Sequence, residues 1–158
     1  MLATLTAFGV GLFVHVLAVV LAFGPTFGFP IFIATAERTS PRSIPTVLRG
    51  LLQIDRFLVN PGMIVILLAG IYLLSEGNIS ASESWVSVGF VAVIALFGMS
   101  HGFFGPKTRQ ALELAERDLA CGDQLSAEYE ALSKRIATGG KIASLIIAVT
   151  IFFMVVQP

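Results

Sequence analysis

Charged side chains are scarce in this sequence and balanced in sign. Only 13% of its 158 residues are Asp, Glu, Lys or Arg, and the formal net charge is zero. A soluble domain carries about 25% charged residues, and a neutral chain gives no reason to expect nucleic acid as a partner. Hydrophobic residues make up 56% of the chain, and the mean hydropathy is +0.88. These features predict an integral membrane protein whose main partner is the lipid bilayer.

Reactive side chains and catalytic motifs are equally scarce. Cys121 is the single cysteine, which excludes an internal disulfide, and His15 and His101 are the two histidines. The sequence contains no GxSxG, HExxH or CxxC motif and no phosphate-binding loop. Hydrolytic catalysis therefore has no support and no catalytic residue is predicted. Whether the protein is an enzyme stays open, and we would expect activity only with a bound cofactor.

Apolar segments define the expected architecture. They cover residues 5–34, 57–74, 85–105 and 142–156, approximately, and a helix of roughly 20 such residues crosses a bilayer. No Lys or Arg precedes the first segment, and it exceeds the roughly 7–15 apolar residues of a signal peptide, so we expect it to span rather than be cleaved. The sequence thus predicts an all-α fold, a transmembrane antiparallel four-helix bundle that forms a single domain over residues 1–158.

All ten basic residues lie in two of the connections between these segments. They are Arg38, Arg42, Arg49 and Arg56 in the first connection, and Lys107, Arg109, Arg117, Lys134, Arg135 and Lys141 in the third. By the positive-inside rule, the connections 37–56 and 106–141 face the cytoplasm and both termini lie outside. We therefore predict a multi-pass protein of the plasma membrane. Residues 106–141 should form a cytoplasmic helical hairpin, with Ser126 as the N-cap of its second helix.

Proline and glycine interrupt the first apolar segment at Gly24-Pro25 and at Gly28-Phe29-Pro30. Proline removes a backbone donor, so a kink or break is expected. Two interpretations stay open: the helix ends there and an interfacial segment follows, or a broken helix lines a cavity.

Residues 43–59 carry one apolar and one polar helical face. They predict either an amphipathic helix in the membrane interface or the inner end of a long second span. Asp55 and Arg56 are expected to be solvated at the level of the lipid headgroups, with a role in gating or substrate binding as the alternative. No carboxylate is expected inside a span.

Small residues recur at helical spacing in two of the segments. In the first, one face holds Thr4, Ala7, Gly11, His15, Ala18 and Ala22. In the third, Gly98-x-x-x-Gly102 marks a second such face. Small residues let helices approach closely in lipid, so both faces should contact other helices, within the bundle or between the protomers of a homo-oligomer.

His15 is the lone ionisable residue of the first segment, and such a residue normally faces the interior of a bundle. Two histidines on different helices can ligate haem from its opposite faces, so His15 and His101 are candidate cofactor-binding residues. The alternative is a packing histidine held by hydrogen bonds. Its candidate partners would be Thr26, Ser87, Ser100, Tyr72 and the backbone near Asn60-Pro61.

Short motifs give the chain a resemblance to known families. They are Phe13-Val14-His15-Val16-Leu17, Phe23-Gly24-Pro25-Thr26, Ala69-Gly70-Ile71-Tyr72-Leu73 and Trp85. With them the chain resembles uncharacterised bacterial families of small integral membrane proteins. More distantly, it resembles the copper-resistance D membrane domain and the membrane protoporphyrinogen oxidase of haem synthesis. The resemblance implies a four-span profile and His15 as a haem or metal contact. The oxidase has a lysine in a later span that residues 85–105 lack.

These observations leave three classes of function. The first is a haem- or metal-binding membrane protein, with haem b as the expected cofactor, that serves redox chemistry or haem handling through His15. The second is a small-molecule or ion transporter or channel, with a path near His15 and the Gly24–Pro30 interruption. The third is a structural membrane subunit without a site.

Overall fold

The computed structural model describes residues 6–157, which are helical almost throughout and include no strand. The α-helices are α1 (Ala7–Thr39), α2 (Ile44–Ile54), α3 (Asn60–Glu76), α4 (Ser84–Met99), α5 (Gly105–Cys121) and α6 (Ala127–Val156). A short 3-10 turn, η1 (Pro41–Ser43), leads into α2. Two π-helical turns, η2 (Asp55–Val59) and η3 (Ser100–Phe104), join α2 to α3 and α4 to α5.

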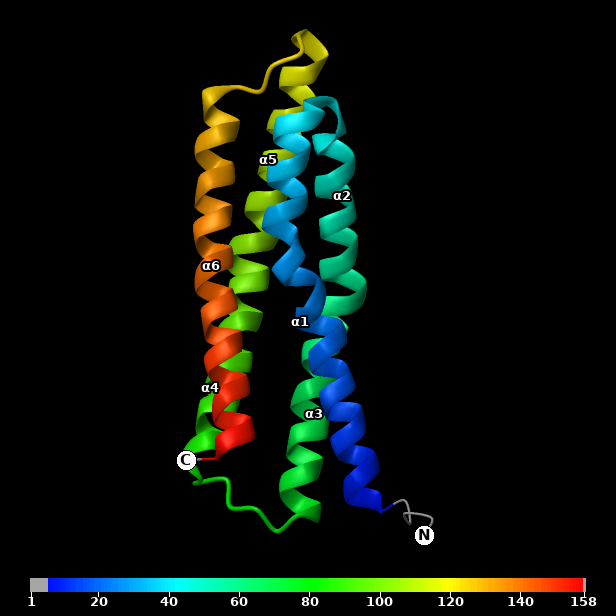
Figure 1. The fold of residues 1–158 in the computed structure, drawn as a ribbon, viewed down its shortest axis with the longest axis vertical. Helices are drawn as coiled ribbons and strands as arrows, with labels where there is room; N and C mark the ends of the chain where they lie inside the picture. The colour runs from blue at the N-terminus through cyan, green and yellow to red at the C-terminus, as the bar shows by residue number, and fades with distance from the viewer. Residues whose placement is uncertain (1–5, 158) are drawn as a thin grey trace.

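The π-helical turns make two of the helical runs continuous. Residues 41–76 and 84–121 each form one long run, and together with α1 and α6 they give four helices of 30 to 38 residues that are apolar enough to cross a membrane. Thirty residues rise about 45 Å, more than the roughly 30 Å of a bilayer's hydrocarbon core. The predicted all-α transmembrane four-helix bundle is confirmed, and each long helix continues beyond its apolar part (Figure 1).

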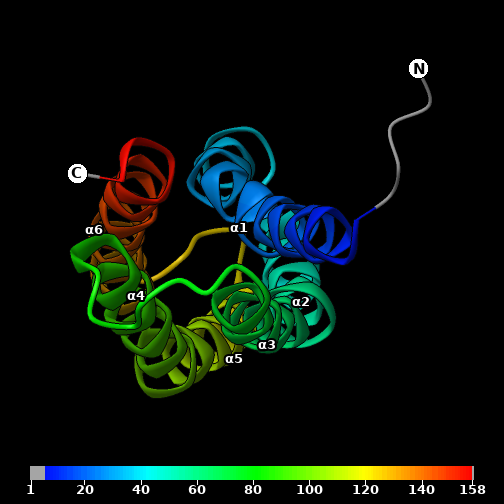
Figure 2. The same ribbon diagram turned by 90° about the horizontal axis from the view of Figure 1, so that it is seen from below.

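Neighbouring runs in the bundle are antiparallel. The start of α1, the end of α6 and the connection 77–83 lie at one end, and the connections 40–43 and 122–126 lie at the other (Figure 1). Figure 2, viewed along the bundle, shows the helices arranged around a common axis. All basic residues belong to the segments 37–56 and 106–141. We call the part of the bundle that these segments form the basic half, and the remainder the apolar half. The predicted helical hairpin of residues 106–141 is confirmed, because α5 and α6 pack side by side across the connection 122–126. The predicted N-cap is confirmed as well: Ser126 accepts a hydrogen bond from the Tyr129 N–H at 3.3 Å.

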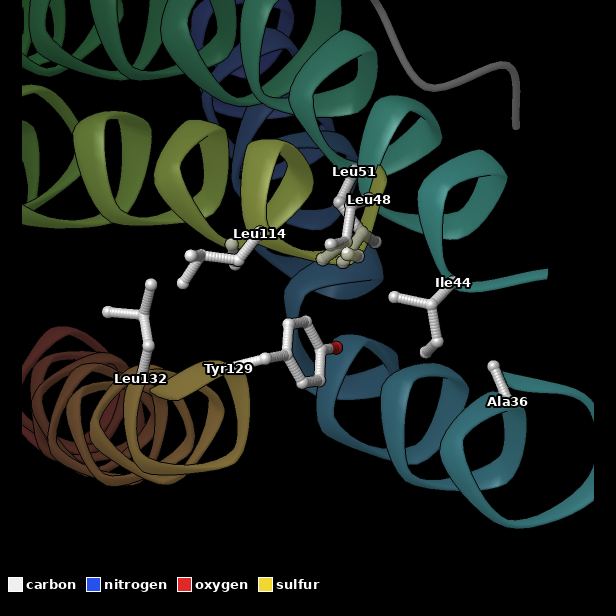
Figure 3. Close-up of a cluster of buried hydrophobic side chains, with 9 residues drawn as sticks. Ala36, Ile44, Leu48, Leu51, Leu114, Tyr129 and Leu132 are labelled. Carbon is white, nitrogen blue, oxygen red and sulfur yellow. The ribbon is translucent and has the colours of Figure 1, made fainter. Parts of the chain in front are cut away.

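Two apolar clusters hold the bundle together. One lies in the apolar half and consists of Ala18, Ala22, Phe23, Val59, Met63, Ile66, Leu96 and Ile147. The other lies in the basic half and consists of Ala36, Ile44, Leu48, Leu51, Ala111, Leu114, Ala115, Tyr129 and Leu132 (Figure 3). Many large apolar side chains point outward instead, including Phe13, Leu68 and Ile94, which are each more than 60% exposed. Such a continuous apolar surface suits lipid rather than water.

α1 stays helical through both of its prolines, Pro25 and Pro30, and changes direction in its middle (Figure 1). The expected kink is therefore confirmed. The interpretation in which the helix ends there is wrong. Of the other interpretation, the break is wrong, but this part of α1 does line a cavity, which is described below. α1 packs against α3, α2, η2 and α6, and this packing supports one continuous helix despite the two prolines. For residues 43–59, the interpretation as the inner end of a long second span is the confirmed one.

The small-residue face of α1 packs against α3 as predicted. Gly11, Ala18 and Ala22 are buried, and a Cβ atom added at Gly11 would lie 2.6 Å from the ring of Tyr72. Across the interface, a Cβ atom added at Gly62 would lie 2.7 Å from the Ala22 Cβ. Ala7 is exposed, and Thr4 lies outside the described residues.

The predicted packing face at Gly98 and Gly102 is wrong within the bundle. A Cβ atom at either glycine would meet nothing within 4 Å, and both residues are exposed. The face of α4 that packs inward holds Val86, Gly89, Ala92 and Leu96, and Gly98 lies on another side of the helix. Association of protomers through Gly98 and Gly102 stays a prediction.

Candidate functional site

A cavity of about 180 Å³ lies between the two apolar clusters, where the apolar half of the bundle meets the basic half. All four long helices contribute to its walls. The walls are mainly apolar and include the rings of Phe23, Phe29 and Phe104. The polar residues among its walls are Thr26, Glu37, Asp55, Ser100, Thr108, Ser133 and Ser144. An apolar pocket with a few convergent polar groups is the usual form of a small-molecule site.

One polar cluster on the cavity wall links the second and third long helices. Asp55 accepts hydrogen bonds from Asn60 Nδ2 at 3.0 Å and from the Ser100 hydroxyl at 2.8 Å. The Asn60 Oδ1 lies 3.3 Å from the same hydroxyl. Ser100 is buried, whereas Asp55 and Asn60 are half-buried. The Asp55 carboxylate therefore sits in the wall of the cavity with neutral partners only.

Local sequence explains why this cluster forms at two π-helical turns. Asp55 is the first residue of η2 and Ser100 is the first residue of η3. Their carbonyl groups accept from the backbone N–H five residues on, at Asn60 and Gly105, and a proline follows each of these two residues. Because proline cannot donate to the carbonyl four residues earlier, the helix widens just before it. Such π-helical turns are frequent at functional sites.

A second polar cluster lies at the other end of the cavity and links α1 to α6. Glu37 Oε1 accepts hydrogen bonds from the Tyr129 hydroxyl at 3.2 Å and from the Ser133 hydroxyl at 2.7 Å. Figure 3 shows the Tyr129 ring reaching from α6 into the cluster of the basic half. Burial, and secondarily the negative charge of Glu37, raise the pKa of the Tyr129 hydroxyl. Tyr129 therefore remains a hydrogen-bond donor to Glu37.

Neither cavity carboxylate, Glu37 or Asp55, has a cationic partner within residues 6–157. The ion pairs there are Arg42–Asp123, Arg49–Glu116, Arg117–Asp118 and Arg117–Glu128, all away from the cavity. Arg56 follows Asp55 in the chain, but it is exposed, and its guanidinium lies over the Phe57 ring, 5.5 Å from the centroid. Asp55 and Glu37 are therefore the charged groups of the cavity, and both are acids.

His15 lies at the interface of α1 and α3. Its Nδ1 atom is 3.1 Å from the carbonyl oxygen of Ile66, and the ring is half-buried next to Gly70. The ring thus faces a neighbouring helix, as predicted. The predicted partners are wrong, however, because the hydrogen bond goes to the Ile66 carbonyl rather than to the expected side chains or to the backbone near Asn60-Pro61. His15 does not line the cavity.

His101 lies elsewhere, on the exposed side of η3. Its Nδ1 atom is 3.1 Å from the carbonyl oxygen of Phe97, and the two rings are 4.3 Å apart. The structure does not bring His15 and His101 together: one faces α3 and the other its own helix. A haem held between the two rings does not fit this arrangement. In the described part of the chain, no group of three or more His, Cys, Asp and Glu side chains is suited to a metal ion.

Comparison with known proteins gives the family. Residues 10–158 match a family described as "Predicted integral membrane protein (DUF2269)". The chain belongs to this family. No curated protein and no solved structure matches it. The DUF2269 match agrees with the predicted membrane family, and it does not test the more distant resemblance to the copper-resistance D domain and the protoporphyrinogen oxidase.

The sequence does not single out Glu37 as a member of a site, and for Asp55 a gating or substrate role is only the alternative to a solvated charge. Both were placed with the charged connections, and no carboxylate was expected within a span. The structure corrects this for Asp55, because it lies inside a continuous helical run and lines the cavity. One signal could have found it. Asp55 and Ser100 stand at equivalent positions, six residues before Pro61 and Pro106.

Proposed function

We propose that this DUF2269 protein is a carrier that binds a small molecule in the cavity between its helices. The observation that supports it is the position of the cavity at the boundary of the apolar and basic halves, with the acids Asp55 and Glu37 in mainly apolar walls. A ligand there can move between lipid and the aqueous side of the basic half. This develops the transporter interpretation, with the path at Thr26–Pro30 rather than at His15.

The helices around the cavity carry the irregularities that a carrier needs in order to open. Pro30 of α1 lines the cavity, and so do the first residues of η2 and η3, Asp55 and Ser100. Proline kinks and π-helical turns interrupt the regular hydrogen bonding of a helix, so bending concentrates at them. Three of the four long helices therefore have a bending point at the same level as the cavity.

Thiol accessibility tests whether the cavity admits a ligand. In a Cys121→Ser background, Ala137→Cys and Ala143→Cys place single thiols on the cavity wall, and Ala148→Cys places one on the exposed face of the same helix. A small, membrane-impermeant thiol reagent supplied to the basic half should modify the two cavity positions. It should spare Ala148→Cys, which faces lipid. Failure to modify either cavity thiol would show a cavity closed to ligands and would refute the proposal.

A second candidate function is haem binding through His15 alone. The observation that favours it is the contact between Nδ1 and the Ile66 carbonyl, because a metal-ligating histidine usually donates its other ring N–H to such an acceptor. The absorbance spectrum of the purified protein tests it. A Soret band that is absent from His15→Ala would support haem b as the cofactor. A protein that stays colourless after addition of haemin would reject it.

A further inference from the structure

We propose that the ligand of the cavity is a small amphiphilic organic cation, an ammonium group attached to an apolar body. This inference rests on the proposed function, because it names the class of molecule that the cavity binds. It is carried by the charges, the free acceptor positions, the aromatic walls and the volume of the cavity.

The charge of the cavity walls determines the sign of the charge that a ligand must carry. Asp55 and Glu37 line the cavity, whereas none of the basic residues, all of which the structure describes, does so. An ionised carboxylate in apolar surroundings is costly unless a cation pairs with it. This chain supplies neutral donors to the two acids and no cation. A cationic ligand completes the site, and an anionic one would be repelled.

Both acids keep acceptor positions for such a ligand. A carboxylate has about four lone-pair sites. Asp55 uses one on each oxygen, toward Asn60 and Ser100. Both hydrogen bonds to Glu37 fall on Oε1, so Oε2 is available. The neutral donors hold each carboxylate in place and leave part of its oxygen surface open to direct charge contact with a cation, whether or not the cation carries an N–H donor.

The remaining walls select an organic cation over a metal ion. Phe23, Phe29 and Phe104 line the cavity, and an aromatic face attracts a cation within about 6 Å. Hard metal cations instead need about six oxygen ligands, which mainly apolar walls do not provide. The volume of about 180 Å³ is below the roughly 300–1,000 Å³ of pockets for drug-sized ligands, so the ligand is small.

A matched pair of probes tests the charge requirement. Benzyltrimethylammonium and neopentylbenzene have nearly the same shape and differ in charge. We expect the purified protein in lipid nanodiscs to bind the cation at least about tenfold more tightly than its neutral counterpart. Asp55→Asn and Glu37→Gln should each weaken binding of the cation by about tenfold or more and leave binding of neopentylbenzene unchanged. Glu113→Gln, which removes an exposed acid of α5, is the control and should change neither affinity.

The outcomes separate this inference from the proposed function. Equal affinity for the two probes, or equal affinity of all variants for the cation, would overturn the inference and leave a cavity for neutral molecules. Absence of binding by either probe at a cavity that thiol reagents reach would also overturn it. Absence of binding at a cavity that they do not reach would refute the carrier itself.

A measurement on the wild-type protein does not depend on whether the variants fold. Dicyclohexylcarbodiimide is an apolar reagent that modifies carboxyl groups in apolar surroundings, and mass spectrometry locates the modified residues. We expect it to modify Asp55 or Glu37, and we expect benzyltrimethylammonium, but not neopentylbenzene, to slow this reaction. Modification at an unchanged rate with saturating cation would overturn the inference.

Discussion

At the scale of single residues, the site depends on polar side chains that have only neutral partners. Asp55 is held by Asn60 and Ser100, and Glu37 is held by Tyr129 and Ser133. These contacts satisfy part of the hydrogen-bonding capacity of each carboxylate. They position the two acids without neutralising them, which is what a site for a cation requires.

The contact between Tyr129 and Glu37 predicts how the stability of the protein depends on pH. Burial and the charge of Glu37 raise the pKa of Tyr129 in the folded state, so folding favours the protonated phenol. This contribution to stability is complete below the unfolded pKa, about 10, and is lost as the pH rises above it. Tyr129→Phe should lower the free energy of unfolding at neutral pH by about 1–3 kcal/mol, because Glu37 loses a donor.

Thermal unfolding in detergent, from neutral pH to above about 10, checks this prediction. The loss of stability with rising pH should be shallower in Tyr129→Phe than in the wild type. Tyr72→Phe is the control, since Tyr72 is 42% exposed and its hydroxyl forms no hydrogen bond within residues 6–157. Identical pH profiles for Tyr129→Phe and the wild type would contradict the assigned contact.

At the scale of helices, the sequence predicted the elements well and their orientation less well. The apolar segments, the hairpin and the Ser126 cap follow from periodicity and local capping chemistry, so they could be predicted. The side of α4 that packs inward depends on the neighbouring helices. The motif Gly98-x-x-x-Gly102 therefore does not determine which side of α4 contacts them. The site was missed for the same reason. Asp55 meets Ser100 only because two π-helical turns from distant segments lie side by side.

The glycines give a test of this helix packing. A Cβ atom at Gly62 would lie 2.7 Å from the Ala22 Cβ and 3.4 Å from its Cα, so the α1 and α3 backbones would have to separate. Gly62→Ala should therefore destabilise the protein by about 1–3 kcal/mol, the usual cost of overpacking. Gly98→Ala is the matched control and should not destabilise, because nothing lies within 4 Å of its Cβ. Thermal unfolding of both variants in detergent measures these effects. A Gly98→Ala variant less stable than Gly62→Ala would refute the observed packing of α1 against α3.

At the scale of the whole molecule, the charge distribution predicts orientation in the membrane. The basic half should face the cytoplasm, with both termini outside. Native Cys121 is exposed at the end of the basic half, and Ala81→Cys in a Cys121→Ser background is exposed at the opposite end. In intact cells, an impermeant thiol reagent should modify the thiol at position 81 and should modify Cys121 only after permeabilisation. Modification of Cys121 alone would show the inverted orientation.

The proposed ligand sits in the cavity between the helices, so a side chain that fills the cavity should block its binding. Ala143 lines the cavity, whereas Ala148, further along α6, is exposed. Binding of benzyltrimethylammonium to Ala143→Phe, Ala148→Phe and the wild type, measured by titration calorimetry in nanodiscs, is the deciding comparison. We predict an affinity about tenfold or more weaker for Ala143→Phe and unchanged for Ala148→Phe. Equal affinities for the wild type and Ala143→Phe would contradict the claim, because the ligand would then bind elsewhere.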